Sequence, residues 1–484
     1  MCRAVLKSFW CCTLTLLFLV PVAASEHASQ HGKFGQLTLE QAVHTALSSN
    51  SRLVTARLNL EGDQQGLESA QAEFDVQLVP SLKLGKIGDN SLSSGTLGAN
   101  NSIGAQFKKK FEYGTTLSVG PSWNRSGGGI NNTTNTTLNL SIQQPLFRGL
   151  DREVTQNGVR TAEFAMATSR RSFEQTRVNV ALETIAAYYQ LVRDQDMLGL
   201  AQSLVERLHR QALVALSKER VGAASSMDTY RAEINLKDAE DAANQATNAV
   251  AASGDRLKLL LDLDLNTRLQ VTAPPIPLLD EIDYEVAAIK GRAELLQLQA
   301  EIDEAERGLR VAKNGLLPDV SLQVNYGLSN SNDPYLSLYL PSTQKQWSVY
   351  LQASTDVFQT TQKNAYRRAA LRLQSLRLSL DTQRAELRRQ VRLQMAQLGE
   401  ARQRIALRHQ QIQQAESKLA LAEVKFSHDM TDNFSLLEAE TELQRSRLNL
   451  LATEAEYATG IYNLQAIAGH LLDRFQSAPT PQSD

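Results

Sequence analysis

The chain repeats one order of elements twice, and this duplication limits the folds open to it. A helical stretch, a region of strand-like alternation and a very long helical stretch ending in a turn precede Pro274, and the same order follows Pro277. Residues 145–149 close the first strand region and residues 356–360 close the second, 211 residues later. Two turns further along the chain lie 207 residues apart. Because the two offsets nearly agree, the pattern indicates a tandem duplication.

The N-terminus has the pattern of a secretory signal peptide. Arg3 and Lys7 precede an apolar run over residues 9–20, and small residues follow, which predicts a signal peptide over residues 1–24 with cleavage after Ala24. The apolar run is too short for a membrane-spanning helix. All three cysteines lie inside this segment, so the mature chain offers no disulfide, thiolate metal site or cysteine nucleophile.

Composition and motifs exclude several function classes. The formal net charge of −2 gives no indication of a nucleic-acid partner. The sequence has no glycine-rich phosphate loop, no His-Glu-x-x-His helix and no nucleophile elbow, so we predict that the protein is not an enzyme. His27 and His31 are four residues apart and could touch a metal, but they lie at the start of the mature chain, where we expect a solvated tail. We therefore expect neither a metal site nor a cofactor.

Two proline-free tracts predict long helices. No proline occurs between Pro145 and Pro274 or between Pro341 and Pro479, and proline breaks helices. Apolar and small residues recur at heptad spacing in both tracts, at Ala201, Val205, Leu208, Ala212 and Ala215 in the first and at Leu436, Ala439, Leu443, Ser446 and Leu450 in the second. As continuous helices, residues 150–220 and 363–428 would each be roughly 100 Å long. Helices of this length predict rods in a bundle or a tube.

The region before each rod alternates in polarity, as a strand with one apolar face does. The first region covers about residues 74–147 and the second about residues 316–358. Their apolar positions include Leu138, Leu140 and Ile142, then Val320, Leu322, Val324 and Tyr326, and then Trp347, Val349, Leu351 and Ala353. Such a face would meet a second sheet in a soluble sandwich and lipid in an outer-membrane barrel. The first region also holds an extra hairpin over about residues 103–119, and the sequence does not decide whether it joins the sheet.

The number of strands predicts an oligomer. Two strands in each repeat give about four per chain, whereas a closed membrane barrel needs at least about eight. No strand edge can be left unpaired in lipid. One chain therefore cannot close a barrel, and we expect at least two copies, with three better suited to a water-filled pore.

Short motifs in this order resemble the TolC family of outer-membrane efflux and export proteins over nearly all of the mature sequence. Residues 37–42, 46–50 and 74–78 look like the start of the family's first repeat, and residues 316–322 look like the strand start of its second. The resemblance implies a trimer in which each copy gives four strands to a shared barrel of about twelve, continuous with a helical tunnel across the periplasm. It also implies docking onto an inner-membrane transporter through a periplasmic adaptor protein. The expected fold is an α+β membrane protein.

The resemblance also implies that the helical tips at about residues 221–228 and 428–435 form a periplasmic gate. Gly222 and Asp228 follow the family pattern in the first tip, and Asp228 matches an aspartate that helps to hold the tunnel shut. The family partners of this aspartate are a tyrosine and an arginine, and they fall here on Phe426 and Thr431. Neither side chain supplies the phenolic hydroxyl or the cation of the family's charge-assisted bonds, so we expect an altered closing network.

Acidic residues near the second tip are further candidates. The positions of the family's acidic ring fall on Ser435 and Glu438, and only Glu438 is charged. Three converging carboxylates in a narrow pore would attract cations and repel anions. Asp429 and Asp432 lie in the turn itself, where ordinary turn chemistry also explains them.

The predicted organisation is a first repeat over residues 25–273, a proline-rich linker over 274–281, a second repeat over 282–470 and a tail over 471–484. The predicted function is that of an outer-membrane exit duct of a tripartite efflux or type I secretion system, which conducts substrates passively out of the cell. The alternative is an exported structural coiled coil without transport activity. The sequence leaves the substrate open among drugs, metabolites, metals and proteins.

Overall fold

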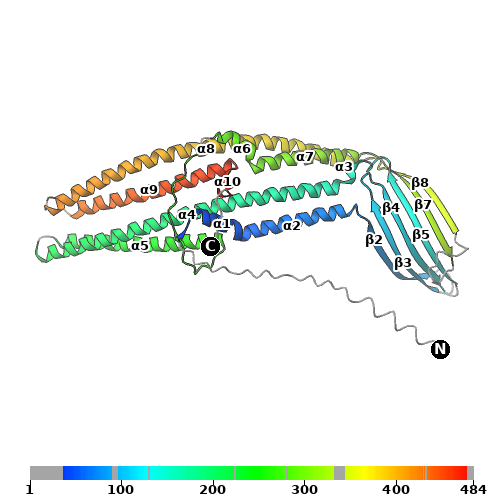
Figure 1. The fold of residues 1–484 in the computed structure, drawn as a ribbon, viewed down its shortest axis with the longest axis horizontal. Helices are drawn as coiled ribbons and strands as arrows, with labels where there is room; N and C mark the ends of the chain where they lie inside the picture. The colour runs from blue at the N-terminus through cyan, green and yellow to red at the C-terminus, as the bar shows by residue number, and fades with distance from the viewer. Residues whose placement is uncertain are drawn as a thin grey trace, which may run out of the picture.

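The computed structural model describes residues 36–89, 96–128, 131–222, 225–279, 282–331, 344–428, 430 and 433–476. Figure 1 shows a long molecule with a sheet at one end and two helical hairpins at the other. The first series of elements is β1 (Gln36–Leu37), α1 (Leu39–Ser49), α2 (Ser51–Ala72), β2 (Gln77–Asp89), β3 (Thr96–Lys110), β4 (Thr116–Gly128), β5 (Asn131–Pro145), α3 (Arg152–Thr155), α4 (Asn157–Arg220), α5 (Ser226–Leu261) and β6 (Gln270–Val271). The second series is α6 (Tyr284–Gly291), α7 (Ala293–Asn314), β7 (Asp319–Ser331), β8 (Gln344–Ser354), α8 (Thr360–Ser427), α9 (Asn433–Ile467) and α10 (Leu471–Gln476).

The expected long helices are present in both series. Helix α4 has 64 residues and α8 has 68, and each returns through a tip into a shorter helix, α5 or α9. Of the ten predicted seam residues, Leu208, Ala215, Leu436, Ala439 and Leu443 are buried and the other five are partly buried, as the heptad spacing predicted. Among the described residues, none of the helices combines the length and the apolar character that crossing a membrane requires.

A buried core at mid-length holds α1 and α10, the first and last described helices, against the rods. Helices α1, α4, α5, α9 and α10 all contribute to it. Tyr188 of α4 is fully buried, and its hydroxyl lies 2.7 Å from both Leu37 O and Thr272 O, next to the parallel pair β1 and β6. Ala42 and Ala46 of α1 have no exposed surface, and their small side chains allow α1 to pack closely. A second cluster connects α6, α7, α8 and α9.

The sheet is antiparallel throughout and has the order β2-β3-β4-β5-β7-β8. The extra hairpin that the sequence left open is β3 and β4, and it lies inside this sheet. The prediction of about four strands per chain is therefore wrong, because the described residues form a sheet of six. Gly120 and Pro121 of β4 are weak strand formers, and the register between β3 and β4 skips them and the residues opposite them, Ala105 and Gln106.

Candidate functional site

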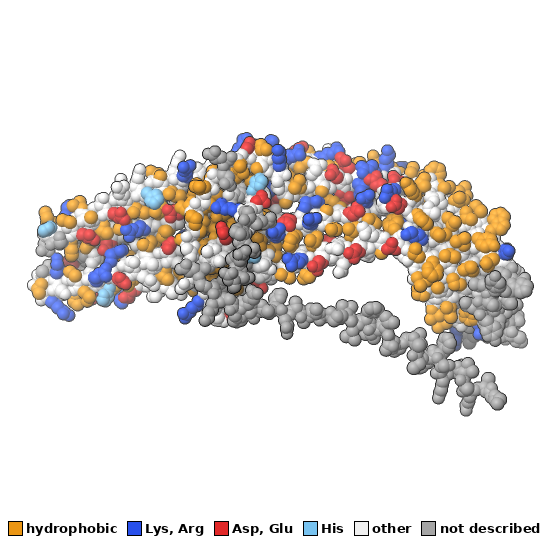
Figure 2. Space-filling view, viewed as in Figure 1, with side chains coloured by type: hydrophobic (Ala, Val, Ile, Leu, Met, Phe, Trp, Pro, Cys, Tyr) orange, Lys and Arg blue, Asp and Glu red, His pale blue; other side chains and the backbone are white. Residues whose placement is uncertain are grey.

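One face of the sheet is apolar across all six strands. Side chains on a strand alternate between its two faces, and the register aligns the apolar positions of neighbouring strands. One such row runs through Leu78, Phe107, Val119, Leu140, Tyr326 and Trp347, with one residue from each strand. Leu78 is 57% exposed and Trp347 is 78% exposed. Figure 2 shows hydrophobic side chains gathered over this end of the molecule. An exposed apolar surface of this extent matches the lipid-facing side of a membrane barrel.

The opposite face of the sheet is polar. The neighbouring row consists of Gln77, Lys108, Ser118, Ser141, Asn325 and Ser348. The hydroxyls of Ser122 and Thr137 lie 2.7 Å apart across β4 and β5, and Asn325 Nδ2 donates to Ser348 Oγ at 3.3 Å. Hydroxyls and amides of this kind suit the water-filled side of a barrel.

The turn between β3 and β4 is fixed to the junction of the sheet and the helices. Gly114 in this turn has φ of +79°, and a Cβ there would lie 2.5 Å from Gly149 O. Lys109 Nζ donates to Phe74 O at 2.5 Å, and an Arg152–Glu112 ion pair joins the turn to α3 at 3.0 Å. The inner end of the β3–β4 hairpin therefore lies at the same junction of sheet and helices as the inner ends of the other strands.

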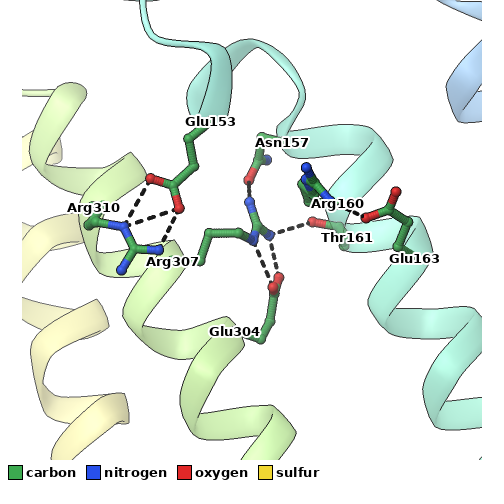
Figure 3. A network of polar contacts seen from close by, with 8 residues as sticks. All are labelled: Glu153, Asn157, Arg160, Thr161, Glu163, Glu304, Arg307 and Arg310. Atoms are coloured by element: carbon green, nitrogen blue, oxygen red, sulfur yellow. Dashed lines mark hydrogen bonds and ion pairs between the residues drawn. The ribbon is translucent and has the colours of Figure 1, made fainter.

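A polar network, which we call the collar, joins the two repeats just below the sheet. It consists of Glu153, Asn157, Thr161, Glu304, Arg307 and Arg310 (Figure 3). Arg307 of α7 is only 9% exposed and donates to Asn157 Oδ1 at 2.6 Å and to Thr161 Oγ1 at 3.0 Å, both on α4. Its Nε donates to Glu304 at 2.7 Å. The charge of Arg307 is thereby paired inside the protein, which buried charges require.

The Glu153–Arg310 pair extends the collar to α3. Arg310 Nε lies 3.1 and 2.9 Å from the two carboxylate oxygens of Glu153. This hydrogen bonding lowers the pKa of Glu153 and raises that of Arg310. The collar thus holds the start of the first rod against α7 of the second repeat.

The first tip is the turn between α4 and α5. Gly222 has φ of +76°, a left-handed conformation that favours glycine, and its N–H donates to Glu219 O at 2.9 Å. The carboxylate of Asp228 accepts bonds from the N–H and the hydroxyl of Ser225, at 3.2 and 3.1 Å. Asp228 therefore caps the start of its own helix α5.

The second tip lies between α8 and α9. Phe426 packs beside Leu436 and Ala439, and Lys218 Nζ of α4 lies 4.5 Å from the centre of its ring. Phe426 thus contacts the first repeat through a cation–π interaction. Ser435 is partly buried in the first turn of α9. Asp429, Thr431 and Asp432 lie outside the described residues.

Glu438 is exposed on α9 and shares a lysine with a second carboxylate. Lys418 Nζ of α8 lies 3.1 Å from Glu438 Oε1 and 2.6 Å from Glu442 Oε2. Glu442 and then Glu438 raise the pKa of Lys418. Two carboxylates against one ammonium leave this patch with a net negative charge.

A buried carboxyl that was not predicted from the sequence lies between the two helical hairpins. Glu440 of α9 has a side chain only 7% exposed, and its Oε1 lies 3.9 Å from Arg207 Nε of α4. Burial raises the pKa of Glu440, Arg207 partly offsets this effect, and Glu423 adds to it. The signal available in the sequence was its position directly after the seam residue Ala439.

Comparisons with known proteins agree with this geometry. The family described as outer membrane efflux protein matches residues 112–262 and 286–470, which together exceed half of the chain. The chain belongs to the outer membrane efflux protein family. No curated protein matched the sequence.

Solved structures resemble the fold of this outer membrane efflux protein. The outer membrane channel CmeC of Campylobacter jejuni is 15% identical with a TM-score of 0.71, covering 90% of this chain and 86% of its own. The outer membrane protein VceC of Vibrio cholerae is 15% identical with a TM-score of 0.70, covering 89% of this chain and 96% of its own. The open-state outer membrane channel MtrE of Neisseria gonorrhoeae is 15% identical with a TM-score of 0.65, covering 90% and 89%.

Membership of the family confirms the resemblance drawn from the short motifs, and with it the expected fold of a barrel sheet continuous with a helical tunnel. It also confirms the location in the outer membrane and the function as an exit duct of efflux systems. The family consists of channels and not of enzymes.

Proposed function

We propose that three copies of this efflux protein form one duct that conducts substrates passively from the periplasm to the outside. Each copy contributes its sheet to a shared barrel and its rods to a shared tunnel. The observation that carries the proposal is the two-faced sheet, which is apolar on one side, polar on the other and continuous with α2, α4, α7 and α8. A sheet built in this way needs lipid against its apolar face and water against its polar face, as in the wall of a closed barrel.

The duct has no energy source of its own in this proposal. A periplasmic adaptor protein and an inner-membrane transporter supply the substrate and the driving force, as the family resemblance suggests. Such a system exports small solutes in efflux or unfolded polypeptides in type I secretion.

We further propose that the two tips form the gate at the periplasmic end. The Lys218–Phe426 contact links α4 to α8 there, and the buried Glu440–Arg207 pair links α9 to α4 above it. Both contacts must rearrange if the two hairpins move apart. Gly222, Asp228 and the residues of the second tip, Phe426, Asp429, Thr431, Asp432, Ser435 and Glu438, are the proposed gate residues.

The molar mass of the detergent-extracted protein, with the bound detergent subtracted, tests the assembly. We expect three times the mass of one chain, and conductance when the same sample is inserted into a planar bilayer. A single-chain mass from gently extracted, folded protein would refute the shared duct. An unchanged susceptibility to dyes and detergents and an unchanged set of secreted proteins in a deletion strain would refute export.

Selectivity tests the acidic patch of the second tip. Glu438→Gln removes one negative charge per copy, so we expect lower cation selectivity. The reversal potential under a salt gradient should move away from the value of a cation-selective pore. Lys418→Gln is the matched variant, because it exposes Glu438 and Glu442 and should move the potential in the opposite direction. If neither variant changes the potential, Glu438 does not line the pore.

A further inference from the structure

The β3–β4 hairpin is paired as completely as the other strands of the sheet. The register between β2 and β3 joins all residues from Gln77 to Asp89 with Lys108 to Thr96, and β4 is joined to β5 from Thr116 to Gly128. Only the skip at Ala105 and Gln106 interrupts the ladder. The hairpin is thus an internal part of the sheet, since β2 lies beyond it at the edge.

The side chains of the hairpin divide between the two faces as those of its neighbours do. Ile103 and Phe107 of β3 are 51% and 47% exposed, and they lie opposite Trp123 and Val119 of β4 on the apolar face. On the other face lie the polar residues Ser102, Asn124, Lys108 and Ser118. A hairpin that projected into water or folded into the lumen would not need an exposed apolar face, because water and not lipid would surround it. The hairpin therefore belongs to the membrane wall.

The two edges of the sheet are suited to pairing with each other. All neighbours are antiparallel, so β2 and β8, at opposite edges of an even number of strands, run in opposite directions. Strand β8 of one copy can then pair antiparallel with β2 of the next. In a membrane such pairing is required, because unpaired backbone N–H and C=O groups cannot face hydrocarbon.

We propose that three copies close an eighteen-stranded barrel, in which β8 of each copy pairs with β2 of the next. The number follows from six strands in each chain and rests on the trimer of the proposed function. Barrel diameter grows roughly linearly with the number of strands, so this barrel is about 1.5 times as wide as one of twelve. Barrels of 16–18 strands leave an open aqueous channel.

The lining of this wide barrel is polar and carries lysine. Lys83 of β2 and Lys108 of β3 lie on the polar face and are exposed. Between Asp319 at the inner end of β7 and the outer ends of the strands, hydroxyl and amide side chains make up most of this face. The outer duct therefore accommodates large hydrated solutes.

Engineered cysteines distinguish the eighteen-stranded barrel from one closed by four strands per copy. The cysteines of the sequence all lie in the first twelve residues, in the predicted signal peptide, so introduced pairs are read without background. Ser348→Cys on β8 is combined in turn with Gln77→Cys, Ser81→Cys and Lys83→Cys on β2. We expect at least one combination to give a disulfide-linked trimer in membranes.

The matched control combines Ser348→Cys with Ser118→Cys or Ser122→Cys on β4. In the six-stranded sheet β4 is paired on both sides, so we expect no cross-link between copies. If β2 and β3 lay outside the barrel, β4 would become the edge and these pairs would cross-link instead. Cross-linking through β4, or none through β2 in protein that has the mass of a trimer, would overturn the proposal. A single-chain mass would refute the trimer itself.

Removal of the hairpin gives a second, independent test. Deleting residues 96–130 joins β2 to β5 through the segment at 90–95, and the apolar residues of both strands stay on one face because β2 and β5 both place even-numbered residues there. End-on electron microscopy of the full chain should show a barrel about 1.5 times as wide as that of the deletion variant. Equal diameters would overturn the proposal. If the deletion variant does not fold, the cysteine pairs decide.

Discussion

The two repeats agree in their helices and differ in their strands. Helices α2 and α7 both have 22 residues, and α5 and α9 have 36 and 35. The first repeat nevertheless contributes four strands to the sheet and the second contributes two. Equivalent helices of the two repeats therefore match in length, even though the helices that pack on each other within a repeat, such as α4 and α5, do not. A hairpin returns the chain to the end where it started, so it adds two strands without moving the start of the next helix.

We expect the largest effect when the buried Arg307 of the collar is compared with Arg52, an arginine of the first repeat in a half-exposed ion pair. Arg307→Met removes a buried charge and leaves Glu304, Asn157 and Thr161 without their partner, so we expect a loss of about 3 kcal/mol in stability. Arg52→Met is the counterpart in the first repeat, where the Arg52–Glu183 pair is half exposed and worth less than about 1 kcal/mol. Thermal unfolding of both variants measures the difference. Equal losses would show that the collar is no more important than a surface pair.

Two glycines test how tightly the extra hairpin is built. A Cβ at Gly120 would lie 2.1 Å from Ala105 O, a backbone atom, so we expect Gly120→Ala to cost about 2 kcal/mol and to lower the yield of folded trimer. In the second repeat, a Cβ at Gly327 would meet only Asn139 Oδ1, at 3.0 Å, and this side chain can move. Gly327→Ala should therefore be nearly neutral. Normal folding of Gly120→Ala would mean that β3 and β4 do not approach as described.

We expect a smaller effect at the first tip, where Asp228 bonds within its own helix. Asp228→Ala removes the cap at the start of α5, which we expect to cost about 1 kcal/mol locally and to change conductance only modestly, since the carboxylate bonds to Ser225. Asp228→Asn keeps an acceptor and serves as the control. Single-channel recording measures both. A large rise in open probability for the alanine variant would show that Asp228 also holds the two tips together.

The smallest expected effect is an opposite pH dependence of two carboxyls. Because Arg310 lowers the folded-state pKa of Glu153, its stabilisation is present above the unfolded pKa of about 4.3 and is lost as the pH falls through the folded value. Because burial raises the folded-state pKa of Glu440, its favourable contribution is present below about pH 4.3 and is lost as the pH rises through the folded value.

Glutamine variants measure these contributions. At pH 7 we expect Glu153→Gln to lower the melting temperature and Glu440→Gln to raise it. Each variant should change the free energy of unfolding by less than about 1 kcal/mol. Both differences from the parent protein should diminish as the pH approaches 4. The same sign for both variants at pH 7 would show that Glu440 is stabilised by Arg207 more than it is penalised by burial.

The sequence was sufficient for the helices because their signals are local and repeated. Proline-free tracts and heptad spacing predicted the rods, and Leu208 and Leu436 are buried as that spacing required. The number of strands was not predictable in the same way, because Gly120 and Pro121 are weak strand formers and only the partner strands show that the ladder continues past them.

The two tips were predictable in position, but the contacts of their residues were not. The family pattern located Asp228 and Glu438 on the sequence, but a capping bond to Ser225 and an ion pair to Lys418 depend on neighbours that no spacing rule selects. Glu440 was missed because a glutamate beside a heptad seam usually faces water. Its burial results from the approach of α4, more than 200 residues earlier in the chain.

The turn at residues 111–115 is the one inner connection of the sheet that leads into no helix, among the described strands. Every other inner strand end continues into a helix or follows one, so in the proposed barrel the width of the outer mouth depends on a segment that the tunnel does not contain. In the barrel and gate proposed above, the width of the outer mouth and the closure of the periplasmic end are therefore independent of each other. Inserting or deleting hairpins, by design or in evolution, would therefore change the width of the outer mouth while the tips keep their dimensions.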